Sequence, residues 1–329
     1  MTKKIAIVGA GLAGLTLARA LQGHAEVTMF DKSRGVGGRM ASRRRLGFAF
    51  DHGAQYFTAR SEAFRAVAEK ALAAGTLGLW PQEIVTLPAG VAAASPRTPE
   101  PFYIGMPSMT GLAAAMAQGQ DIRLETHVSA LRRVDAKWQL VDDRAGSLGL
   151  FDLVVSTVPA PQAERLMPAA FSGCNVLQSV RMAGCFTLMI GGLQPPELDF
   201  HAARVDHPIL SWVAVNNSKP GRDTPFSLVV HSRNDWAQIH IEDATEHVRR
   251  TMLSALEEVT GHNFAQASWI DLQRWRYASV DVAAGQPFLL DAENGLAACG
   301  DWCIGGRVEA AFESGNRLGE AMLSLLGAG

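Results

Sequence analysis

The feature that most constrains this chain is a strand, a glycine-rich turn and a helix at its N-terminus. Residues 5–8, Ile-Ala-Ile-Val, form an apolar run that predicts a buried parallel strand. Three glycines with the spacing GxGxxG follow it, namely Gly9, Gly11 and Gly14. An apolar segment over about residues 12–21 then predicts a helix. This order of elements is that of the first unit of a dinucleotide-binding fold.

Each glycine has a separate physical task in such a turn. Gly9 permits the tight bend, Gly11 lets the backbone approach a pyrophosphate, and Gly14 lets the helix pack closely on the strand. The helix N-terminus then points its N–H groups and its positive dipole end at the phosphates. A second strand over residues 26–30 ends at Asp31, where a carboxylate can accept hydrogen bonds from a ribose diol. A simple surface turn is the alternative, and the register of all these elements disfavours it.

Composition excludes several other classes of protein. The 329 residues are 48% hydrophobic and 19% charged, which is enough apolar material for a sizeable core. The formal net charge is −2 and there is no basic tract, so neither a nucleic-acid-binding surface nor an obligate protein partner is expected. No run of 18 uncharged apolar residues occurs after the N-terminal segment, so no membrane span is predicted there. The four cysteines form no CxxC pair, which favours free thiols in a reducing cytoplasm and no metal site.

The residues after the second strand distinguish a flavin from a nicotinamide dinucleotide. Residues 37–39, Gly-Gly-Arg, follow Asp31 in a pattern that resembles the long fingerprint of glutathione-reductase-type and amine-oxidase-type flavoproteins. The resemblance implies noncovalently bound FAD, with Arg39 at the flavin diphosphate. These flavoproteins usually carry Glu where this chain has Asp31, whose shorter side chain should still reach a ribose.

Later segments resemble further parts of that flavin site. Residues 295–301 form an apolar strand running into Gly-Asp, which implies a role for Asp301 at the ribityl chain or pyrophosphate. A helix expected over about residues 308–326 would point its N-terminus at the flavin, where its dipole stabilises negative charge on the reduced ring. Val128 matches a valine whose backbone meets adenine in these flavoproteins. The predicted cofactor-binding residues are Gly9, Gly11, Leu12, Ala13, Gly14, Asp31, Lys32, Gly38, Arg39, Gln55, Tyr56, Val128, Gly300, Asp301 and Val308.

The segment Asp-His-Gly-Ala-Gln-Tyr-Phe-Thr at residues 51–58 narrows the resemblance. Together with residues 209–217, 228–231 and 273–277, it is similar to the renalases, particularly the bacterial ones, over nearly the full chain. The resemblance implies an FAD-dependent oxidoreductase that takes a hydride from 1,2- or 1,6-dihydro isomers of β-NAD(P)H. β-NAD(P)⁺ then leaves, and O₂ reoxidises the flavin to give H₂O₂. A dinucleotide and O₂ are thus the expected partners.

The expected fold class is α/β, with a Rossmann-like FAD-binding domain of the p-hydroxybenzoate hydroxylase and amine oxidase type. A second, α+β substrate domain would be built on an antiparallel sheet, because residues 185–190, 209–215 and 226–232 are β-rich apolar runs. We expect residues 1–60, 100–171 and 289–329 in the FAD-binding domain. Residues 61–99 and 172–288 are expected in the substrate domain, whose sheet would cover the flavin ring.

Candidate substrate residues lie in the second domain and in the loops around it. His231 shares one strand face with Ser227 and Val229, and is the candidate for orienting a nicotinamide carboxamide, with Asn217 beside it. A satisfied sheet histidine is the equal alternative. Two loops combine a cation with hydroxyls, which suits a substrate diphosphate. The predicted substrate-binding residues are Phe57, Thr58, Ala59, Arg60, Ser61, Pro96, Arg97, Thr98, Thr187 and Trp302.

Two other functions remain open at this point. One is a flavin-dependent amine oxidase or desaturase, and the other is a non-catalytic flavoprotein that senses redox state. Amine oxidases of this superfamily commonly keep a lysine near flavin N5. The only lysine after residue 150 is Lys219, which the sequence places in a Pro-Gly turn, so we expect it to be dispensable.

Overall fold

The computed structural model describes residues 2–80, 83–88, 100–192 and 196–327 of the chain. Two compact units account for these residues. Unit 1 comprises Met1–Arg39, Leu112–Met182 and Val280–Gly329, and unit 2 comprises Met40–Gly111 and Ala183–Ser279.

Unit 1 is built on a mostly parallel sheet. Its strand order is β18-β19-β12-β1-β2-β8, and all neighbours are parallel except β18 and β19. These strands span Leu289–Asp291 (β18), Leu296–Ala298 (β19), Leu153–Ser156 (β12), Lys4–Val8 (β1), Glu26–Phe30 (β2) and Asp121–Arg123 (β8). The short apolar runs in the sequence form the central strands because both of their faces are buried.

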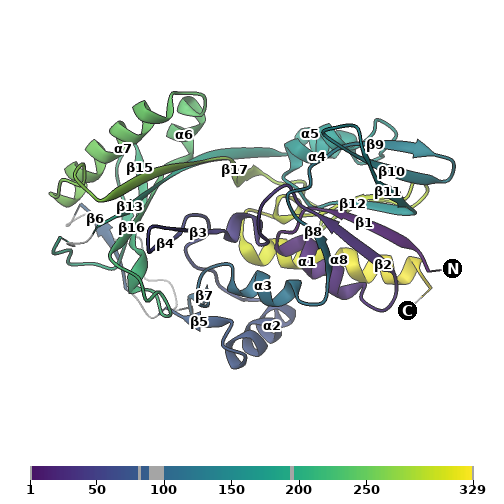
Figure 1. Cartoon of the computed structure of the whole chain (residues 1–329), viewed down its shortest axis with the longest axis horizontal. Coiled ribbons are helices and arrows are strands. Elements are labelled where there is room, and N and C mark those ends of the chain that lie inside the picture. The colour runs from purple at the N-terminus through teal and green to yellow at the C-terminus, as the bar shows by residue number, and fades with distance from the viewer. Residues whose placement is uncertain (1, 81–82, 89–99, 193–195, 328–329) are drawn as a thin grey trace. The chain divides into compact units, whose positions relative to one another are not determined.

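Helices α1 (Leu12–Ala20) and α8 (Val308–Leu325) pack against each other in unit 1 (Figure 1). Their backbones come close because a glycine lies at the contact. A Cβ atom at Gly315 would lie 2.3 Å from the carbonyl oxygen of Ala13. A side chain at that position would therefore push the two helices apart.

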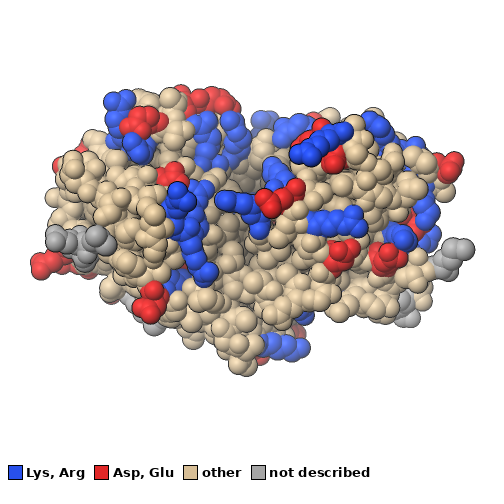
Figure 2. All heavy atoms as spheres, in the orientation of Figure 1, with Lys and Arg blue, Asp and Glu red and all other residues tan. Residues whose placement is uncertain are grey.

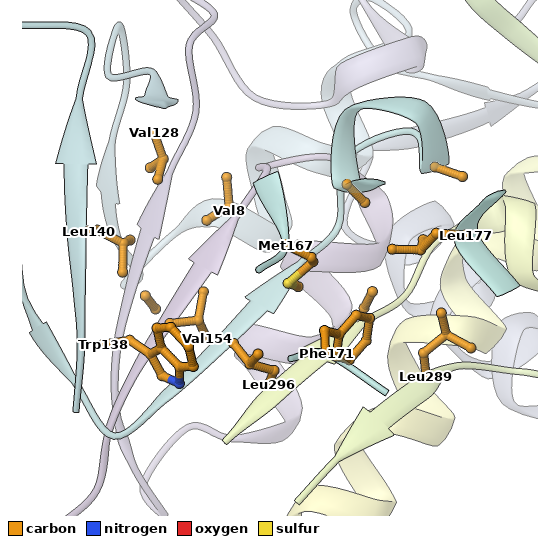
Figure 3. Packing of buried hydrophobic residues seen from close by; sticks show 14 of the residues in the cluster. Val8, Val128, Trp138, Leu140, Val154, Met167, Phe171, Leu177, Leu289 and Leu296 are labelled. Carbon is orange, nitrogen blue, oxygen red and sulfur yellow. The ribbon is translucent and has the colours of Figure 1, made fainter. Parts of the chain in front are cut away.

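The other face of the parallel sheet carries a second, antiparallel layer. Strands β9 (Val128–Val134), β10 (Lys137–Asp142) and β11 (Ser147–Phe151) form it, and Trp138 and Leu140 point from it into the core. Val8 and Val154 of the parallel sheet belong to the same cluster, as Figure 3 shows. Two short helices, α4 (Ala160–Leu166) and α5 (Cys174–Ser179), close its end with Met167, Phe171 and Leu177.

Unit 2 is built on a mostly antiparallel sheet. Its order is β17-β13-β16-β15-β14-β6; β13, β16, β15 and β14 pair antiparallel in turn, and β6 pairs with β14 in parallel. The strands span Trp269–Val282 (β17), Arg181–Gly191 (β13), Ser227–Ser232 (β16), Leu210–Val215 (β15), Ala202–Val205 (β14) and Ile84–Leu87 (β6).

The two faces of this sheet are covered by different elements. Helices α6 (Asn234–His240) and α7 (Thr245–Thr260) bury one face, through residues such as Met252 and Leu256 (Figure 1). On the opposite face, the hairpin of β3 (Ser42–Arg45) and β4 (Phe48–Asp51) packs Phe48 and Phe50 against Met189 and Val229. Alternation along β16 therefore places Val229 and His231 on the β4 side.

Three smaller elements complete unit 2. Helix α2 (Glu62–Ala73) precedes a two-stranded sheet of β5 (Leu77–Leu79) and β7 (Tyr103–Gly105). Helix α3 (Gly111–Ala117) follows them in the chain and, apart from its first residue, belongs to unit 1. Basic and acidic side chains are interspersed over the face of the molecule shown in Figure 2. Within the described residues, no helix is both long and apolar enough to cross a membrane.

The observed architecture confirms the expected α/β fold class, but the unit boundaries differ from the expected domains. Residues 40–60 and 100–111, expected with the FAD-binding domain, lie in unit 2. The reason is that β4 packs on β16 and that β5 and β7 pair with each other. Residues 172–182 and 280–288 lie in unit 1 instead of the substrate domain, since α5 joins the core of that unit.

We predict that Gly315→Ala destabilises the protein by about 1–3 kcal/mol, because the added methyl group overpacks the contact between α1 and α8. Gly35→Ala is the matched control, since a Cβ there meets no atom within 4 Å. Urea unfolding measures both free energies. Equal stability of the two variants would show that the helices adjust without cost.

Candidate active site

The glycine turn in unit 1 has the geometry that a dinucleotide requires. Gly9 adopts φ +115°, and a Cβ at Gly14 would lie 2.3 Å from the carbonyl oxygen of Gly9. A Cβ at Gly11, in contrast, meets no atom within 4 Å. Gly9 and Gly14 thus serve the fold, whereas Gly11 leaves open space beside the start of α1. No side chain caps this helix, so its first N–H groups can bind an anion.

Asp31 lies at the end of β2 and holds the glycine turn in place. Its Oδ2 accepts a hydrogen bond from the Ala10 N–H at 2.7 Å, and its Oδ1 accepts one from the Ser33 N–H at 2.8 Å. The carboxylate is only half-buried and each oxygen retains a further lone pair. Asp31 therefore joins the two parts of a nucleotide site and can still accept a bond from a ribose hydroxyl.

Arg39 and Asp301 bind each other. The guanidinium of Arg39 forms a bidentate ion pair with the buried carboxylate of Asp301, with N–O distances of 2.8 and 2.5 Å. The sequence placed both residues at the flavin but did not predict that they pair. The pair links η1 (Gly38–Met40) to η3 (Asp301–Cys303), so the two flavin motifs meet in unit 1.

The remaining cofactor candidates of unit 1 fall into two groups. Lys32 and Gly38 are exposed, and Gly37 and Gly11 form a β-bridge, so this loop borders the glycine turn. The others lie at element starts or in the core: Leu12 and Ala13 are buried on α1, Val128 begins β9, Gly300 precedes η3, and Val308 begins α8. Together, the open turn, the uncapped helix and Asp31 fit the adenosine diphosphate part of FAD.

Unit 2 contains a cluster of polar side chains, buried except for a partly exposed histidine, which we call the polar cluster. Its members are Asp51, Gln55, Asn216, Lys219, Arg222 and His231. Asp51 lies at its centre, where its Oδ2 accepts bonds from Arg222 at 2.7 Å and Lys219 at 3.3 Å. Its Oδ1 accepts bonds from the Ser42 hydroxyl at 2.6 Å and the Met109 N–H at 3.0 Å.

The charge of Asp51 is stabilised by this surrounding. Burial alone would raise its pKa, but Lys219 and Arg222, with the hydrogen bonds from Ser42 and Met109, hold the pKa of Asp51 well below its usual range. One carboxylate thus faces two cations. While Lys219 is protonated, the polar cluster carries one positive charge in excess.

Lys219 lies at the Pro-Gly turn, as the sequence suggested, but its side chain points inward. Its side chain is fully buried, its ammonium donates to Gln55 Oε1 at 3.1 Å, and it lies 5.2 Å from the centre of the Trp80 ring. Burial lowers the pKa of Lys219 to about 8, with Asp51 opposing the shift and Arg222 adding to it. The side chain points into unit 2 because η2 (Asn216–Ser218) turns the chain inward just before it. That Lys219 is dispensable for hydride transfer stays a prediction.

His231 lies at the edge of the polar cluster and is partly exposed. Its Nε2 is 3.3 Å from the side-chain nitrogen of Gln55. Desolvation, then the charge of Lys219, lowers the pKa of His231 to about 3. His52 stacks on Trp275 nearby, and desolvation with the charge of Arg43 lowers its pKa to about 4. Both rings are therefore neutral at pH 7.

Asn217, predicted beside His231, has a different role. Its side-chain oxygen accepts a hydrogen bond from the Ser227 N–H at 3.1 Å and so fixes the start of β16. The buried asparagine is its neighbour, Asn216, which accepts from the Asp51 N–H and donates to the Ala49 carbonyl oxygen. The sequence could not show which of the two adjacent asparagines faces inward, because a 3₁₀ turn interrupts the alternation of the strand there.

The residues of the predicted phosphate clamp at 57–61 make contacts within the protein, and their role toward a substrate stays a prediction. Phe57 stacks on Tyr103 in the core, and Ser61 caps α2 by accepting from the Phe64 N–H. Arg60 forms a bidentate ion pair with Glu100. Thr58 and Ala59 are only half-buried between them. The other predicted clamp residues, Pro96, Arg97 and Thr98, lie outside the described residues.

Three further candidates are held by packing. Trp302 is fully buried in the core of unit 1, where its indole N–H donates to the Val158 carbonyl oxygen at 3.0 Å, so it is a core residue and does not stack on a substrate. Thr187, opposite His231, is also fully buried, and its hydroxyl donates to the His52 carbonyl oxygen. Tyr56 packs in an aromatic group with Phe102, at a centroid distance of 4.2 Å.

Sequence reasoning missed the centre of the polar cluster. Asp51 begins the segment at residues 51–58, and Lys219 and Arg222 flank the Pro-Gly turn, but nothing in their spacing links residues so far apart in the chain.

Among the described residues, no group of three or more His, Cys, Asp or Glu side chains is placed to hold a metal ion.

We predict that Asp51→Asn lowers the free energy of unfolding by about 3–5 kcal/mol, because it leaves two buried cations without their counter-charge. Lys219→Met retains the pair of Asp51 and Arg222 and should cost less. The exposed Asp199 supplies the control, since Asp199→Asn should stay within about 0.5 kcal/mol of wild type. Urea unfolding that ranks Asp51→Asn with the control would contradict the central role of Asp51.

We also predict a loss of stability below neutral pH. The folded-state pKa values of His52 and His231, about 4 and about 3, lie below the unfolded value of 6.5. The unfolded chain therefore binds protons first as the pH falls through 6.5, and each histidine lowers the free energy of unfolding by about 1.4 kcal/mol per pH unit. Urea unfolding at pH 7, 6 and 5 measures this slope. His231→Gln should remove about half of it, whereas the same slope in that variant would contradict the assignment.

Comparisons with known proteins bear on both units. The structure is similar to a protein from Exiguobacterium sp. 255-15 provisionally named protoporphyrinogen oxidase, with a TM-score of 0.76 and 15% identity over 98% of this chain and 99% of that one. A putrescine oxidase bound to putrescine gives a TM-score of 0.75 and 14% identity, again over 98% and 99%. At these identities the likeness establishes the fold alone.

One curated relative shares a short region of sequence. The 4,4'-diapophytoene desaturase of Staphylococcus aureus (strain Newman) is 54% identical over 52 residues, which are 15% of this chain and 10% of the desaturase. The match thus spans only one tenth of the length of that relative.

Two family models cover most of the chain. Residues 7–71 match the NAD(P)-binding Rossmann-like domain, and residues 100–323, well over half of the chain, match the flavin containing amine oxidoreductases. The family binds a flavin, and the N-terminal turn of this chain has the geometry that a dinucleotide requires. Together they confirm FAD as the cofactor expected from the sequence. The chain belongs to the flavin containing amine oxidoreductase family.

Proposed function

We propose that this protein is a renalase-type oxidase that takes a hydride from 1,2- or 1,6-dihydro isomers of β-NAD(P)H. Noncovalently bound FAD would supply the acceptor for the hydride and the route of the electrons to O₂, so that β-NAD(P)⁺ and H₂O₂ would be the products. The proposed partners are accordingly a dinucleotide and O₂, and the proposed location is the cytoplasm. The resemblance of residues 51–58 and 228–231 to renalases supports the choice of substrate.

The observation that carries the proposal is the charge of the polar cluster. Asp51 is its only carboxylate among the described residues, and both of its oxygens are engaged by Lys219, Arg222, Ser42 and Met109. No carboxylate of the cluster is thus available to bind an ammonium group, and the excess positive charge opposes one. An uncharged dihydronicotinamide ring meets no such penalty, and its carboxamide can bond to a neutral histidine.

The chain's own residues would then have separate tasks. His231 orients the carboxamide of the substrate, and the packed aromatic residues around Tyr56 exclude water from that side of unit 2. Gly11 and the N-terminus of α1 hold the diphosphate of FAD, and Asp31 holds its ribose. Hydride transfer needs no strong base, which agrees with the lowered pKa of His231.

The buried Lys219 favours a second candidate, a flavin amine oxidase. Such enzymes commonly keep a lysine near flavin N5, and the protonation state of Lys219 can change near pH 8, where its pKa lies. The excess positive charge around Lys219 nevertheless repels the protonated form of an amine. The two candidates therefore predict opposite responses to a cationic substrate.

Anaerobic mixing of the purified holoprotein with each substrate class tests the proposal. We expect dihydro-NAD isomers to bleach the flavin within one turnover, whereas putrescine and catecholamines should leave it oxidised. Bleaching by an amine alone would favour the amine oxidase, and bleaching by neither class would favour a flavoprotein without this catalytic role. Admitting O₂ to the reduced protein should then yield one H₂O₂ per flavin. Acid precipitation should release all of the flavin, because its binding is noncovalent.

A further inference from the structure

The side-chain amide of Gln55 has only one orientation that satisfies its neighbours. Lys219 can only donate hydrogen bonds, so the atom 3.1 Å from its ammonium must be the oxygen of Gln55. The other end of the amide lies 2.5 Å from the Asp51 carbonyl oxygen and 3.1 Å from the Gly53 carbonyl oxygen. Two acceptors on one side and a cation on the other require the amide nitrogen to face Asp51 and Gly53.

This orientation determines the tautomer of His231. The amide nitrogen of Gln55 is also 3.3 Å from His231 Nε2. Its two hydrogens therefore serve three neighbours, so one hydrogen is shared, and an amide nitrogen does not itself accept hydrogen bonds. The contact is favourable only if Nε2 of the histidine carries no proton and accepts. A neutral imidazole keeps one proton, which must then be on Nδ1. The nearby charge of Lys219 disfavours a second proton on this ring.

We infer that Gln55, held by Lys219 and two carbonyl groups, is a positioning residue that fixes His231 as the Nδ1–H tautomer and so makes it a hydrogen-bond donor to the substrate. The ring is partly exposed, and the described residues provide no hydrogen-bond partner for Nδ1. A donor at this place recognises an acceptor such as a carbonyl oxygen. The identification of that acceptor as a carboxamide rests on the proposed function, whereas the tautomer itself does not.

A fixed donor has a different chemical use from a free histidine. The Nδ1–H can orient a carbonyl oxygen, but a ring whose second nitrogen is bound by Gln55 is a poor general base. The arrangement therefore suits a reaction in which a hydride leaves from a carbon beside an oriented carbonyl group. It does not suit one that begins with proton removal from an ammonium group.

NMR of the ¹⁵N-labelled holoprotein at pH 7 measures the tautomer directly, through the two-bond couplings from the carbon-bound ring protons to the ring nitrogens. The His231 resonances are identified by their loss in His231→Gln. We expect the proton on Nδ1, with Nε2 at the chemical shift of an unprotonated imidazole nitrogen. A proton on Nε2, or a charged ring, would overturn the inference.

Gln55→Glu tests the role of Gln55 in nearly the same shape. A carboxylate there accepts from His231, so the proton should move to Nε2, and the ring should begin to titrate at higher pH than in wild type. Gln118→Glu adds the same charge at an exposed position of unit 1 and should change neither. An unchanged tautomer in Gln55→Glu would remove Gln55 from this role. If that variant does not fold, the wild-type spectrum alone decides.

The same samples separate this inference from the proposed function. An Nδ1–H tautomer in a holoprotein whose flavin is not reduced by dihydro-NAD would retain the inference and reject the substrate. Reduction by dihydro-NAD with the proton on Nε2 would retain the substrate and reject the inference.

Discussion

The buried carboxylate of Asp51 is the constraint on which unit 2 depends. A charge removed from water must be met by other charges and by hydrogen-bond donors, and its partners come from β3, from the segment before α3 and from the turn after β15. These segments are far apart in the chain. Their common contact with one side chain holds β4 and the turn at residues 216–222 against the same face of the sheet.

Unit 1 depends on a different constraint, the close approach of backbones. Gly14 lets α1 approach the turn at Gly9, and Gly315 lets α8 approach α1. Gly11 is free of such contacts, so the absence of its side chain serves a ligand and not the fold. The same motif thus contains glycines required by packing and one required by binding, and only the structure separates them.

The sequence predicted what depends on neighbouring residues and missed what depends on distant ones. The strand from residue 26 to residue 30 and the helix beginning at residue 308 agree with β2 and α8, because periodicity and glycine spacing are local signals. The burial of the Lys219 side chain, in contrast, could not be predicted, because its partner Asp51 is 168 residues away in the chain. Trp302 was misassigned for the same reason, because its partner Val158 is distant in the chain. The ion pair of Arg60 with Glu100 was likewise not predicted.

The hydrogen bonds already made within the protein explain why the structure identifies the cofactor more readily than the substrate. Around the glycine turn, open space and unpaired N–H groups are left for a ligand, and these have one chemical meaning, an anionic dinucleotide. In the polar cluster, nearly every donor and acceptor already has a partner within the protein, so little polarity is left to identify a substrate. Among the described residues, two nitrogens of the polar cluster have no partner: the buried Nε of Arg222 and the Nδ1 of the partly exposed His231. Under the proposed function, the discrimination among substrates comes from the partly exposed N–H group of His231 and from the excess positive charge of the polar cluster, which together favour a neutral carbonyl compound over a cation.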